Sequence, residues 1–361
     1  MRAALLVGRG GPEMLEVRTD VPVPRPGTGE ALIRVVACGM NNTDINTRVG
    51  WYSPAVTGAT TGTGFAETGA DDYTWGGTGL AFPRIQGADP SGTVVAVGRD
   101  VEPALLGRRA LVDPWIRHPD DPTDREQARY LGSELDGGFA EYCVVPARNI
   151  HVHSSSLSDV ELASFPCSWS TAEHMLQRVG LEPGHSIAVT GASGGVGSAL
   201  IGLAKRRGAH VVAVAGASKL DEVRRLGADE VVARENENVP DAAREANDGP
   251  FDVVADVVGG PDVGDWLRML RRGGRYVTAG AIAGPIVELD LRTLYLNDLE
   301  LYGATVFAPP VFAALVSYIE RGEIEPAVGA TFPLEEIHAA QAAFERKAHT
   351  GALVLTIAEG E

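Results

Sequence analysis

The chain has 361 residues, a formal net charge of −17 and three cysteines. This length favours two domains, each large enough to bury its own core. The negative charge argues against a general nucleic-acid binder, since phosphate binding depends on Lys and Arg. The three cysteines are far apart and form no CxxC pair, so we expect a reducing, cytoplasmic environment without disulfides. No apolar run approaches about 18 residues, so we expect neither a membrane span nor export.

The first 148 residues are predicted to form a β-rich, barrel-like domain. Short apolar segments alternate with Gly, Pro and Asp, as is typical of strands joined by tight turns. The expected strands lie at 31–37, 91–98, 110–114 and 139–146.

From about residue 158 the pattern changes to alternating strands and helices. Near-continuous apolar strands indicate a parallel sheet that is covered on both faces. The expected strands are 186–190, 210–215, 230–232, 251–258 and 275–280, and the expected helices are 196–207, 220–226 and 264–272, the last ending at Gly273 and Gly274. Two more helices, at 311–322 and 334–347, are followed by a final strand at 352–357.

The segment VTGASGGVGSA lies between the first of these strands and its helix. Glycines there allow a tight turn and close approach of a pyrophosphate, which the helix N-terminus stabilises. The strand before and the helix after the motif make a dinucleotide site the favoured interpretation over a simple turn. The predicted cofactor-binding residues are Gly191, Gly194, Gly195, Val196 and Gly197.

The end of the next strand bears on cofactor choice. A carboxylate that would hold the ribose 2′-hydroxyl of NAD is missing there, and the chain runs through Gly216 and Ala217 to Ser218 and Lys219. Ser218 and Lys219 can bind a 2′-phosphate, so we expect NADPH. A solvated lysine at a helix start is the alternative.

Residues 55–80 are rich in Gly and Thr and lack periodicity. Long loops of this kind are usually functional or disordered. Because the segment carries Phe65, Tyr73 and Trp75, we expect a mobile flap at the mouth of a cleft. A surface loop or a contact between subunits is the alternative.

Taken together, the strings resemble the medium-chain dehydrogenase/reductase superfamily over nearly the whole chain. The matching strings are ALIRVVACGMNNTD, GADPSGTVVAVG, GGFAEYCVVP, LASFPCSWSTA, GASGGVG, LGADEVV, FDVVADVVGG and GALVLT. The resemblance implies an α/β protein with a GroES-like β-barrel catalytic domain (1–155), a Rossmann domain with a doubly wound parallel sheet (156–305), a return to the catalytic domain (306–361) and an active site in the cleft.

Zinc-dependent members of this superfamily hold catalytic zinc with Cys, His and Cys. The corresponding positions are Asn41, Ala88 and Cys167, so only one ligand is retained, and residues 113–136 lack the cysteines of the structural zinc lobe. We therefore expect no metal, and a packing role for Cys167. Nor do His151, His153 and His174 have metal-like partners in the sequence.

The resemblance thus points to the zinc-free branch, the quinone oxidoreductases and enoyl reductases. These enzymes reduce activated C=C bonds, which needs polar donors and an acid more than a metal. The string NNTDINTRVGWY resembles a segment of mitochondrial-type enoyl thioester reductases. On that match Tyr52 is the candidate proton donor and Asn42 orients the substrate, although Tyr52 is equally often a packing residue.

Other positions follow from the same resemblance. Thr171 matches a position beside the cofactor, with a helix N-cap or turn role as the alternative. Asp44 is expected to be a structural hydrogen-bonding residue, and Asp89 replaces the usual family glutamate. The segment GAIAG corresponds to the loop whose backbone fixes the nicotinamide, which assigns Gly280, Ala281 and Ile282 to the cofactor.

The sequence thus predicts an NADPH-dependent reductase of an enone, enoyl thioester or quinone. A zinc-free carbonyl or alcohol dehydrogenase and a non-enzymatic NADPH-binding protein are the alternatives. We expect a homodimer that acts on a small molecule and binds neither nucleic acid nor membrane.

Overall fold

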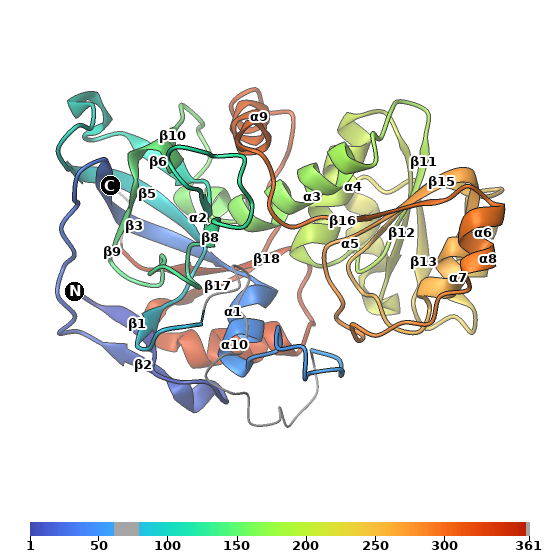
Figure 1. Cartoon of the computed structure of the whole chain (residues 1–361), viewed down its shortest axis with the longest axis horizontal. Helices are drawn as coiled ribbons and strands as arrows, with labels where there is room; N and C mark the ends of the chain where they lie inside the picture. Colours follow the sequence, from blue (N-terminus) through green and yellow to red (C-terminus); the bar gives the residue numbers. More distant parts are fainter. Residues whose placement is uncertain (61–78, 359–361) are drawn as a thin grey trace.

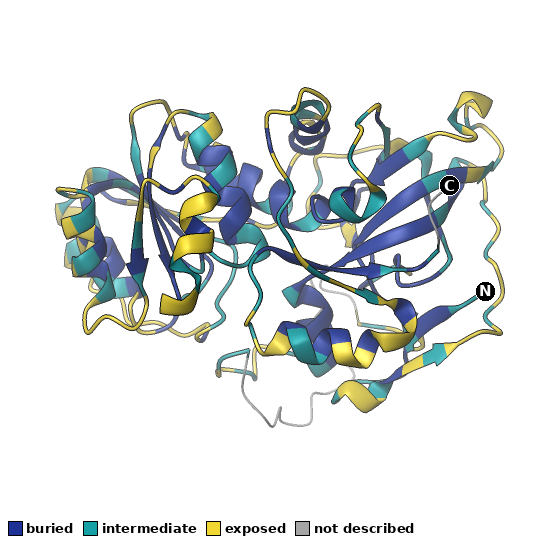
Figure 2. Ribbon diagram, turned by 180° about the vertical axis from the view of Figure 1, so that it is seen from behind, coloured by how far each residue is buried: buried dark blue, intermediate teal, exposed yellow. Residues whose placement is uncertain are grey.

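The computed structural model describes residues 1–60 and 79–358. Figure 1 shows two sheet-based bodies with helices between them. The β-rich body contains both ends of the described chain, and the parallel-sheet body contains its middle. Figure 2 shows that the central strands of both sheets are buried. None of the described helices is both long and apolar enough to cross a bilayer.

The main sheet of the β-rich body has the order β10-β6-β5-β3-β18-β17, with β9 also paired to β3. The last strand of the chain pairs antiparallel with β3, with Leu355 opposite Cys38, so the C-terminal segment completes this sheet. Its strands are β3 (Glu30–Met40), β5 (Asp89–Val97), β6 (Arg109–Val112), β9 (Tyr142–Pro146), β10 (Ile150–Val152), β17 (Val328–Pro333) and β18 (Ala352–Thr356).

Two small sheets flank the main one. The first has the order β2-β1-β4 and the second pairs β7 with β8. Their strands are β1 (Ala3–Leu6), β2 (Leu15–Arg18), β4 (Arg84–Ile85), β7 (Trp115–Ile116) and β8 (Arg129–Tyr130).

The second main sheet has six parallel strands in the order β13-β12-β11-β14-β15-β16. Alternate residues of β12 enter different cores: Val211 and Ala213 lie in one apolar cluster, Val212 and Val214 in another. Helices cover both faces for this reason. The elements are β11 (Ser186–Val189), β12 (His210–Ala215), β13 (Glu230–Ala233), β14 (Phe251–Asp256), β15 (Leu270–Thr278), β16 (Glu300–Gly303), α4 (Gly195–Arg206), α5 (Leu220–Arg225), α6 (Val239–Ala246), α7 (Val263–Arg268) and α8 (Leu291–Leu296).

Of the remaining helices, α3 and α9 lie between the two bodies, whereas α2 and α10 pack on strands of the β-rich body. The long helix α3 packs against α4 and α9, and one apolar cluster contains Trp115 and Tyr130 of the β-rich body together with Val189 of the parallel sheet. These helices are α1 (Asn42–Val49), α2 (Asp159–Leu162), α3 (Pro166–Arg178), α9 (Pro309–Glu320) and α10 (Ile337–Glu345). Short 3-10 helices lie at Pro12–Met14, Pro103–Leu105, Ala147–Asn149, Ala217–Lys219 and Leu334–Glu336.

The expected helix over 264–272 is wrong at its C-terminal end. Helix α7 stops at Arg268, and β15 already begins at Leu270, which is buried opposite Phe251 of β14. Gly273 lies inside this strand at φ +72°. Pairing with β14 thus outweighs the helical periodicity that the sequence shows here.

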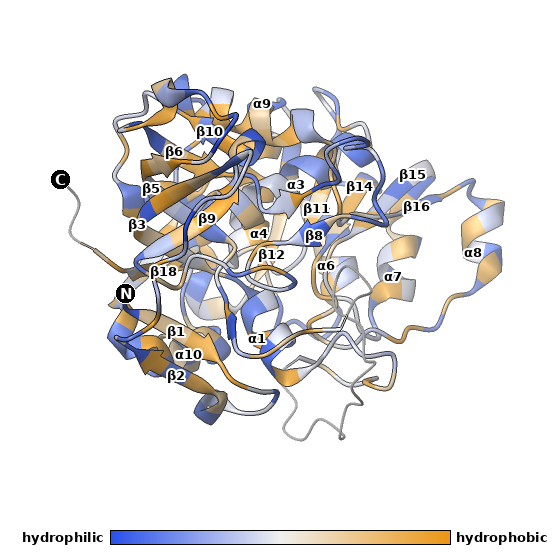
Figure 3. Ribbon diagram, turned by 60° about the vertical axis from the view of Figure 1, so that its left-hand side comes forward, coloured by the Kyte–Doolittle hydropathy of each residue, from blue (hydrophilic) through white to orange (hydrophobic). Residues whose placement is uncertain are grey.

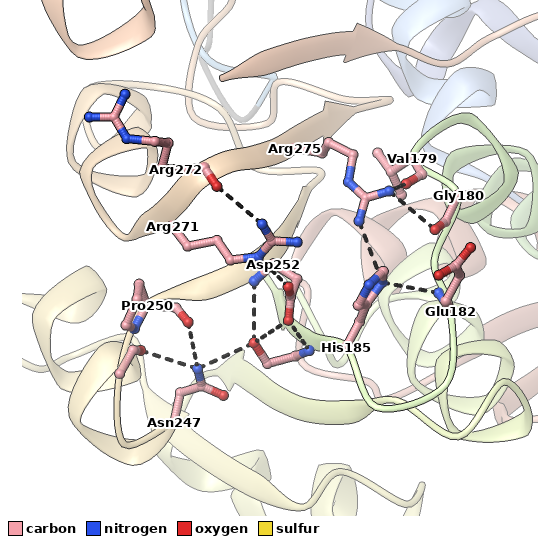
Figure 4. Close-up of polar contacts among 12 residues, drawn as sticks. Val179, Gly180, Glu182, His185, Asn247, Pro250, Asp252, Arg271, Arg272 and Arg275 are labelled. Carbon is pink, nitrogen blue, oxygen red and sulfur yellow. Dashed lines mark hydrogen bonds and ion pairs between the residues drawn. The ribbon is translucent and has the colours of Figure 1, made fainter. Parts of the chain in front are cut away.

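A cluster of polar side chains links the amino ends of the parallel strands. The Asp252 carboxylate accepts a hydrogen bond from the Ser186 backbone N–H at 2.8 Å and is ion-paired with Arg271. Figure 4 shows this pair and, beside it, Arg275 directed at the carbonyls of Val179 and Gly180. The cluster lies at the amino ends of the strands, whereas the glycine motif lies at their carboxyl ends. We therefore interpret the cluster as structural.

Candidate active site

The glycine motif forms the turn between β11 and α4, at the carboxyl end of the parallel sheet. Gly191 has φ +59°, and a Cβ on Gly197 would lie 2.2 Å from the carbonyl oxygen of Gly191. Both positions therefore require glycine. The N-cap residue is Gly194, which has no side chain to cap the first turn of α4. The turn leaves this helix N-terminus able to accept a phosphate.

The site lies where the strand order reverses, between β11 and β14. Asp256 at the end of β14 accepts hydrogen bonds from the hydroxyls of Thr190 and Tyr276 and, at 2.8 Å, from the backbone N–H of Val258. Burial raises the pKa of the Tyr276 phenol. Ligands of open parallel sheets bind in such a crevice, and the hydrogen bonds of Asp256 fix the backbone on one side of it.

The loop 280–284 packs against the end of β14. The Ala283 N–H donates to the Val258 carbonyl at 2.8 Å, which places Gly280, Ala281 and Ile282 beside the crevice. The Thr60 N–H also donates to the Ile282 carbonyl at 3.0 Å. The start of the 55–80 segment thus reaches across to the predicted nicotinamide loop. Phe65, Tyr73 and Trp75 lie outside the described residues, and the flap stays a prediction.

Ser218 and Lys219, the two residues that were predicted to bind a 2′-phosphate, lie just after the end of β12. Ser218 is exposed, whereas the Lys219 ammonium donates to the His349 carbonyl at 2.9 Å and to the Lys347 carbonyl. The Ser193 hydroxyl of the glycine motif is 3.4 Å from this ammonium. Burial lowers the pKa of Lys219.

A carboxylate that the sequence reasoning missed also lies here. Glu235, just after β13, accepts a hydrogen bond from the Ala217 N–H at 2.9 Å and is 3.3 Å from Arg234. The neighbouring strand supplies it, so spacing from the glycine motif gives no signal for it. The Glu235 carboxylate and the Lys219 ammonium group therefore both lie near the end of β12.

On the other side of the cleft, a buried polar network joins α1, β5 and α3. The Asn41 side-chain amide donates to Asp89 at 2.9 Å, and the Asn41 side-chain oxygen is 3.3 Å from the Ser168 hydroxyl. The Cys167 backbone N–H donates to the second Asp89 oxygen at 2.9 Å. Burial raises the pKa of Asp89 well above its usual range.

Asp44 has the structural role that was expected. Its carboxylate accepts a hydrogen bond from the Asn41 N–H at 2.7 Å and caps α1. Burial raises its pKa to about 7. The cap fixes the start of α1 and so the position of Asn41.

The residues at the family's zinc position do not fit a metal. The Asn41 amide is bound to Asp89 and Ser168, and Ala88 offers no ligating atom. Burial raises the pKa of the Cys167 thiol well above its usual range, so the thiol stays protonated. Across 1–60 and 79–358, no group of three or more His, Cys, Asp or Glu side chains is arranged to hold a metal ion.

The two predicted catalytic residues lie at opposite ends of α1. Asn42 is the first residue of the helix, where its side-chain oxygen accepts a hydrogen bond from Lys347 at 2.8 Å. Tyr52 follows the C-cap glycine Gly50 and packs edge-on against Trp51 at 5.6 Å between ring centroids. An eight-residue helix is about 12 Å long, so the structure does not place these two residues side by side.

Two further residues at the site have no sequence motif. The Tyr130 hydroxyl lies against the Cys167 thiol, which also contacts the Thr171 hydroxyl one helical turn along α3. Thr171 thus lies inside this helix and is not its N-cap. Lys347 comes from the C-terminal segment after α10. Only the three-dimensional fold brings Tyr130 and Lys347 to the cleft.

A cavity of about 630 Å³ opens elsewhere in the β-rich body. Ile116, Leu135 and Val144 line it, and none of the predicted site residues does. The nucleotide crevice is therefore the better candidate for the active site.

Comparison with known proteins supports this assignment. Residues 27–155 match the alcohol dehydrogenase GroES-like domain, and residues 195–321 match the zinc-binding dehydrogenase family. The structure of a provisionally named alcohol dehydrogenase from Sinorhizobium meliloti 1021 is 47% identical, with a TM-score of 0.90 over 99% of this chain and 97% of that one.

Two named relatives are more distant. An NAD-dependent alcohol dehydrogenase of Sulfurisphaera tokodaii is 28% identical over 94% of this chain and 95% of the relative. A quinone oxidoreductase of Lama guanicoe is 28% identical over 93% of this chain and 91% of the relative.

The fold and the crevice define a two-domain pyridine-nucleotide oxidoreductase, with a GroES-like domain and a Rossmann domain. The chain belongs to the medium-chain dehydrogenase/reductase superfamily. The predicted α/β fold class and the predicted enzyme class are confirmed.

Proposed function

We propose that the protein is an NADPH-dependent, zinc-independent reductase that transfers hydride to the activated C=C bond of an enone or enoyl thioester, or to a quinone. The observation that carries the proposal is the Asn41–Asp89 hydrogen bond of 2.9 Å at the family's metal position. A zinc enzyme polarises a carbonyl by Lewis acidity. This chain offers hydrogen-bonding groups in the same place, which suit an acceptor whose charge spreads over a conjugated system.

The names of the relatives are compatible with this class and with a second one. Quinone oxidoreductases and NAD-dependent alcohol dehydrogenases match the chain with similar identity. Carbonyl or alcohol chemistry is therefore the second candidate. The pairing of Asn41 with Asp89 favours the first, because carbonyl reduction would need another electrophile in place of zinc.

The bound nicotinamide would supply the hydride. The chain's residues would hold it. The glycine motif would receive the phosphates, Thr171, whose hydroxyl contacts Cys167, would lie beside the cofactor, and the 280–284 loop would fix the carboxamide. Asn42 would orient the acceptor, and Tyr52 would return a proton to the α-carbon.

The choice of NADPH rests on the groups around the end of β12. Ser218 and Arg234 are exposed, and Lys219 lies beside the glycine motif. The negative charge of Glu235 would repel a 2′-phosphate. Its carboxylate, however, already accepts hydrogen bonds from the Ala217 N–H and from Arg234. The surrounding cations thus leave a site that suits an anion.

We also propose the domain boundaries 1–155, 156–305 and 306–361, a cytoplasmic location and a homodimer. Free Cys38, Cys143 and Cys167 support a reducing compartment. Edge strand β16 and helix α8 support self-association, because they lie beside a stretch of exposed apolar residues, visible on α8 in Figure 3. Its members are Ile286, Val287, Leu289, Leu291, Tyr295, Leu296 and Leu301.

The test is a steady-state survey with chelator present. Each of NADPH and NADH is offered with an enone, an enoyl thioester, a quinone and a saturated ketone. We expect the highest kcat/KM for NADPH with one of the first three acceptors. Faster turnover of the saturated ketone would replace the proposal by the second candidate.

A further inference from the structure

The chain contains three lysines, and two of them, Lys219 and Lys347, meet at the cleft. Lys205 pairs with Asp229 at 2.8 Å. Within the part of the chain that the structure describes, no ion pair joins Lys219 or Lys347 to a carboxylate. The Lys347 ammonium instead donates to Asn42 and lies 3.9 Å from the centre of the Phe344 ring.

A second feature near Lys347 is a pair of helix N-termini. Asn42 begins α1, and its neighbour Asn41 meets Ser168 at 3.3 Å. Ser168 packs on the first residue of α4, since a Cβ on Gly195 would lie 2.5 Å from the Ser168 hydroxyl. The N-termini of α1 and α4 therefore lie on either side of Ser168. Asp44 caps the first turn of α1, whereas α4 has no side-chain cap, so the dipole of α4 directs positive potential into this space.

The C-terminal segment ties the two lysines to the glycine motif. The Gly351 N–H donates to the Ser193 carbonyl at 2.8 Å, and the Lys347 carbonyl accepts from Lys219. Lys347 has φ +51°, a left-handed conformation that a lysine rarely adopts. The backbone thus turns sharply where the side chain enters the cleft.

We propose that Lys347 binds the pyrophosphate of the nicotinamide cofactor, an inference that rests on the proposed cofactor site. The uncapped N-terminus of α4 and two ammonium groups converge where that anion is expected, and the carboxylate nearest in sequence, Glu345, is paired with Arg48 at 2.7 Å. Burial lowers the pKa of Lys347 to about 8. A bound anion would restore the ordinary pKa and so favour the charged lysine.

The two lysines then have different tasks. Lys219 lies at the end of β12, where a 2′-phosphate would lie, and it discriminates NADPH from NADH. Lys347 contacts a group that both cofactors share. Its removal must therefore weaken both cofactors by the same factor.

The experiment measures dissociation constants by calorimetry for NADPH, NADH and ADP-ribose, which keeps the pyrophosphate and lacks nicotinamide. Lys347→Met removes the charge and retains the stem. We expect all three affinities to fall by about tenfold or more, with the NADPH-to-NADH ratio unchanged. Lys347→Arg should retain most of the affinity, and the surface control Lys205→Met should match the wild type. Lys347→Gln replaces the Met variant should the latter not fold.

Three results would overturn the inference. Unchanged affinity for NADH and ADP-ribose in Lys347→Met would remove any role at the pyrophosphate. A loss confined to NADPH would assign Lys347 to the 2′-phosphate. Equal losses in Lys347→Arg and Lys347→Met would indicate packing and not charge. A wild type that binds neither dinucleotide would overturn the cofactor proposal as well, whereas a wild type that binds both leaves that proposal standing whatever Lys347 does.

Discussion

Asn41 and Asp89 form a 2.9 Å hydrogen bond at the position where zinc-dependent relatives hold their metal. The Asn41 amide has two partners, and Asp89 is desolvated enough to raise its pKa. This pair is part of a buried hydrogen-bond network, and such a network is costly to leave half satisfied.

We therefore predict that the purified protein contains no stoichiometric zinc. Asn41, Ala88 and Cys167 cannot form the three-ligand set of a catalytic site. Elemental analysis of protein prepared without chelator checks this. About one zinc per chain, with activity that chelation abolishes, would favour the alcohol dehydrogenase candidate.

The raised pKa of Asp44 predicts how the free energy of unfolding depends on pH. Its pKa in the folded state is about 7, against an ordinary value of 3.8, because it is buried. The folded protein therefore binds a proton that the unfolded chain releases, and the free energy of unfolding should fall as pH rises from about 4 to 7. Asp44→Asn should flatten this dependence in urea titrations at several pH values. A wild-type slope equal to that of the variant would contradict the assignment.

Cofactor preference should depend on Lys219. Loss of one charge-assisted hydrogen bond costs about 1.5 to 3 kcal/mol, so Lys219→Ala should weaken NADPH by tenfold or more and NADH much less. Titration of both cofactors measures this. Glu235→Gln is the companion variant, since removing the opposing charge should raise the NADPH-to-NADH ratio. The predicted preference for NADPH would be refuted by equal wild-type affinities for NADPH and NADH. An NADPH-to-NADH affinity ratio that Lys219→Ala leaves unchanged would refute the role of Lys219.

Tyr52 is the proposed proton donor, although it lies at the far end of α1 from Asn42. Tyr52→Phe keeps the ring and removes the phenol. General acids contribute about 10²- to 10⁴-fold, so we expect kcat to fall by at least tens-fold while the Kd for NADPH is unchanged. Full activity of the variant would make solvent or another residue the proton source. Tyr130 is the first alternative, because its hydroxyl reaches Cys167.

The sequence predicts most of the parallel-sheet body. Strands such as 210–215 and helices such as 220–226 agree closely with β12 and α5. The strand is a continuous apolar run, and the helix places its apolar residues three positions apart. The predicted C-terminal end of α7 is wrong, because the pairing of Leu270 with Phe251 is a tertiary contact that periodicity cannot reveal. The prediction also lacks α6, α8 and β16 of this body. Helices α1 and α3 are missing from it because polar residues interrupt their apolar positions.

The site is predictable only where a local motif fixes the backbone. The glycine motif needs Gly191 and Gly197 for reasons that spacing makes visible. Glu235, Tyr130 and Lys347 come from other strands or from the end of the chain, so no local pattern marks them. Their positions follow from strand order and from the return of β18 to β3.

The central claim is that hydride goes to the C=C bond. Reduction of an enone with NADPH that carries deuterium at the transferred position, in the presence of chelator, tests it most directly, with the product analysed by NMR. We predict deuterium on the β-carbon of a saturated ketone. Deuterium on the carbinol carbon of an allylic alcohol would show carbonyl reduction and contradict the account.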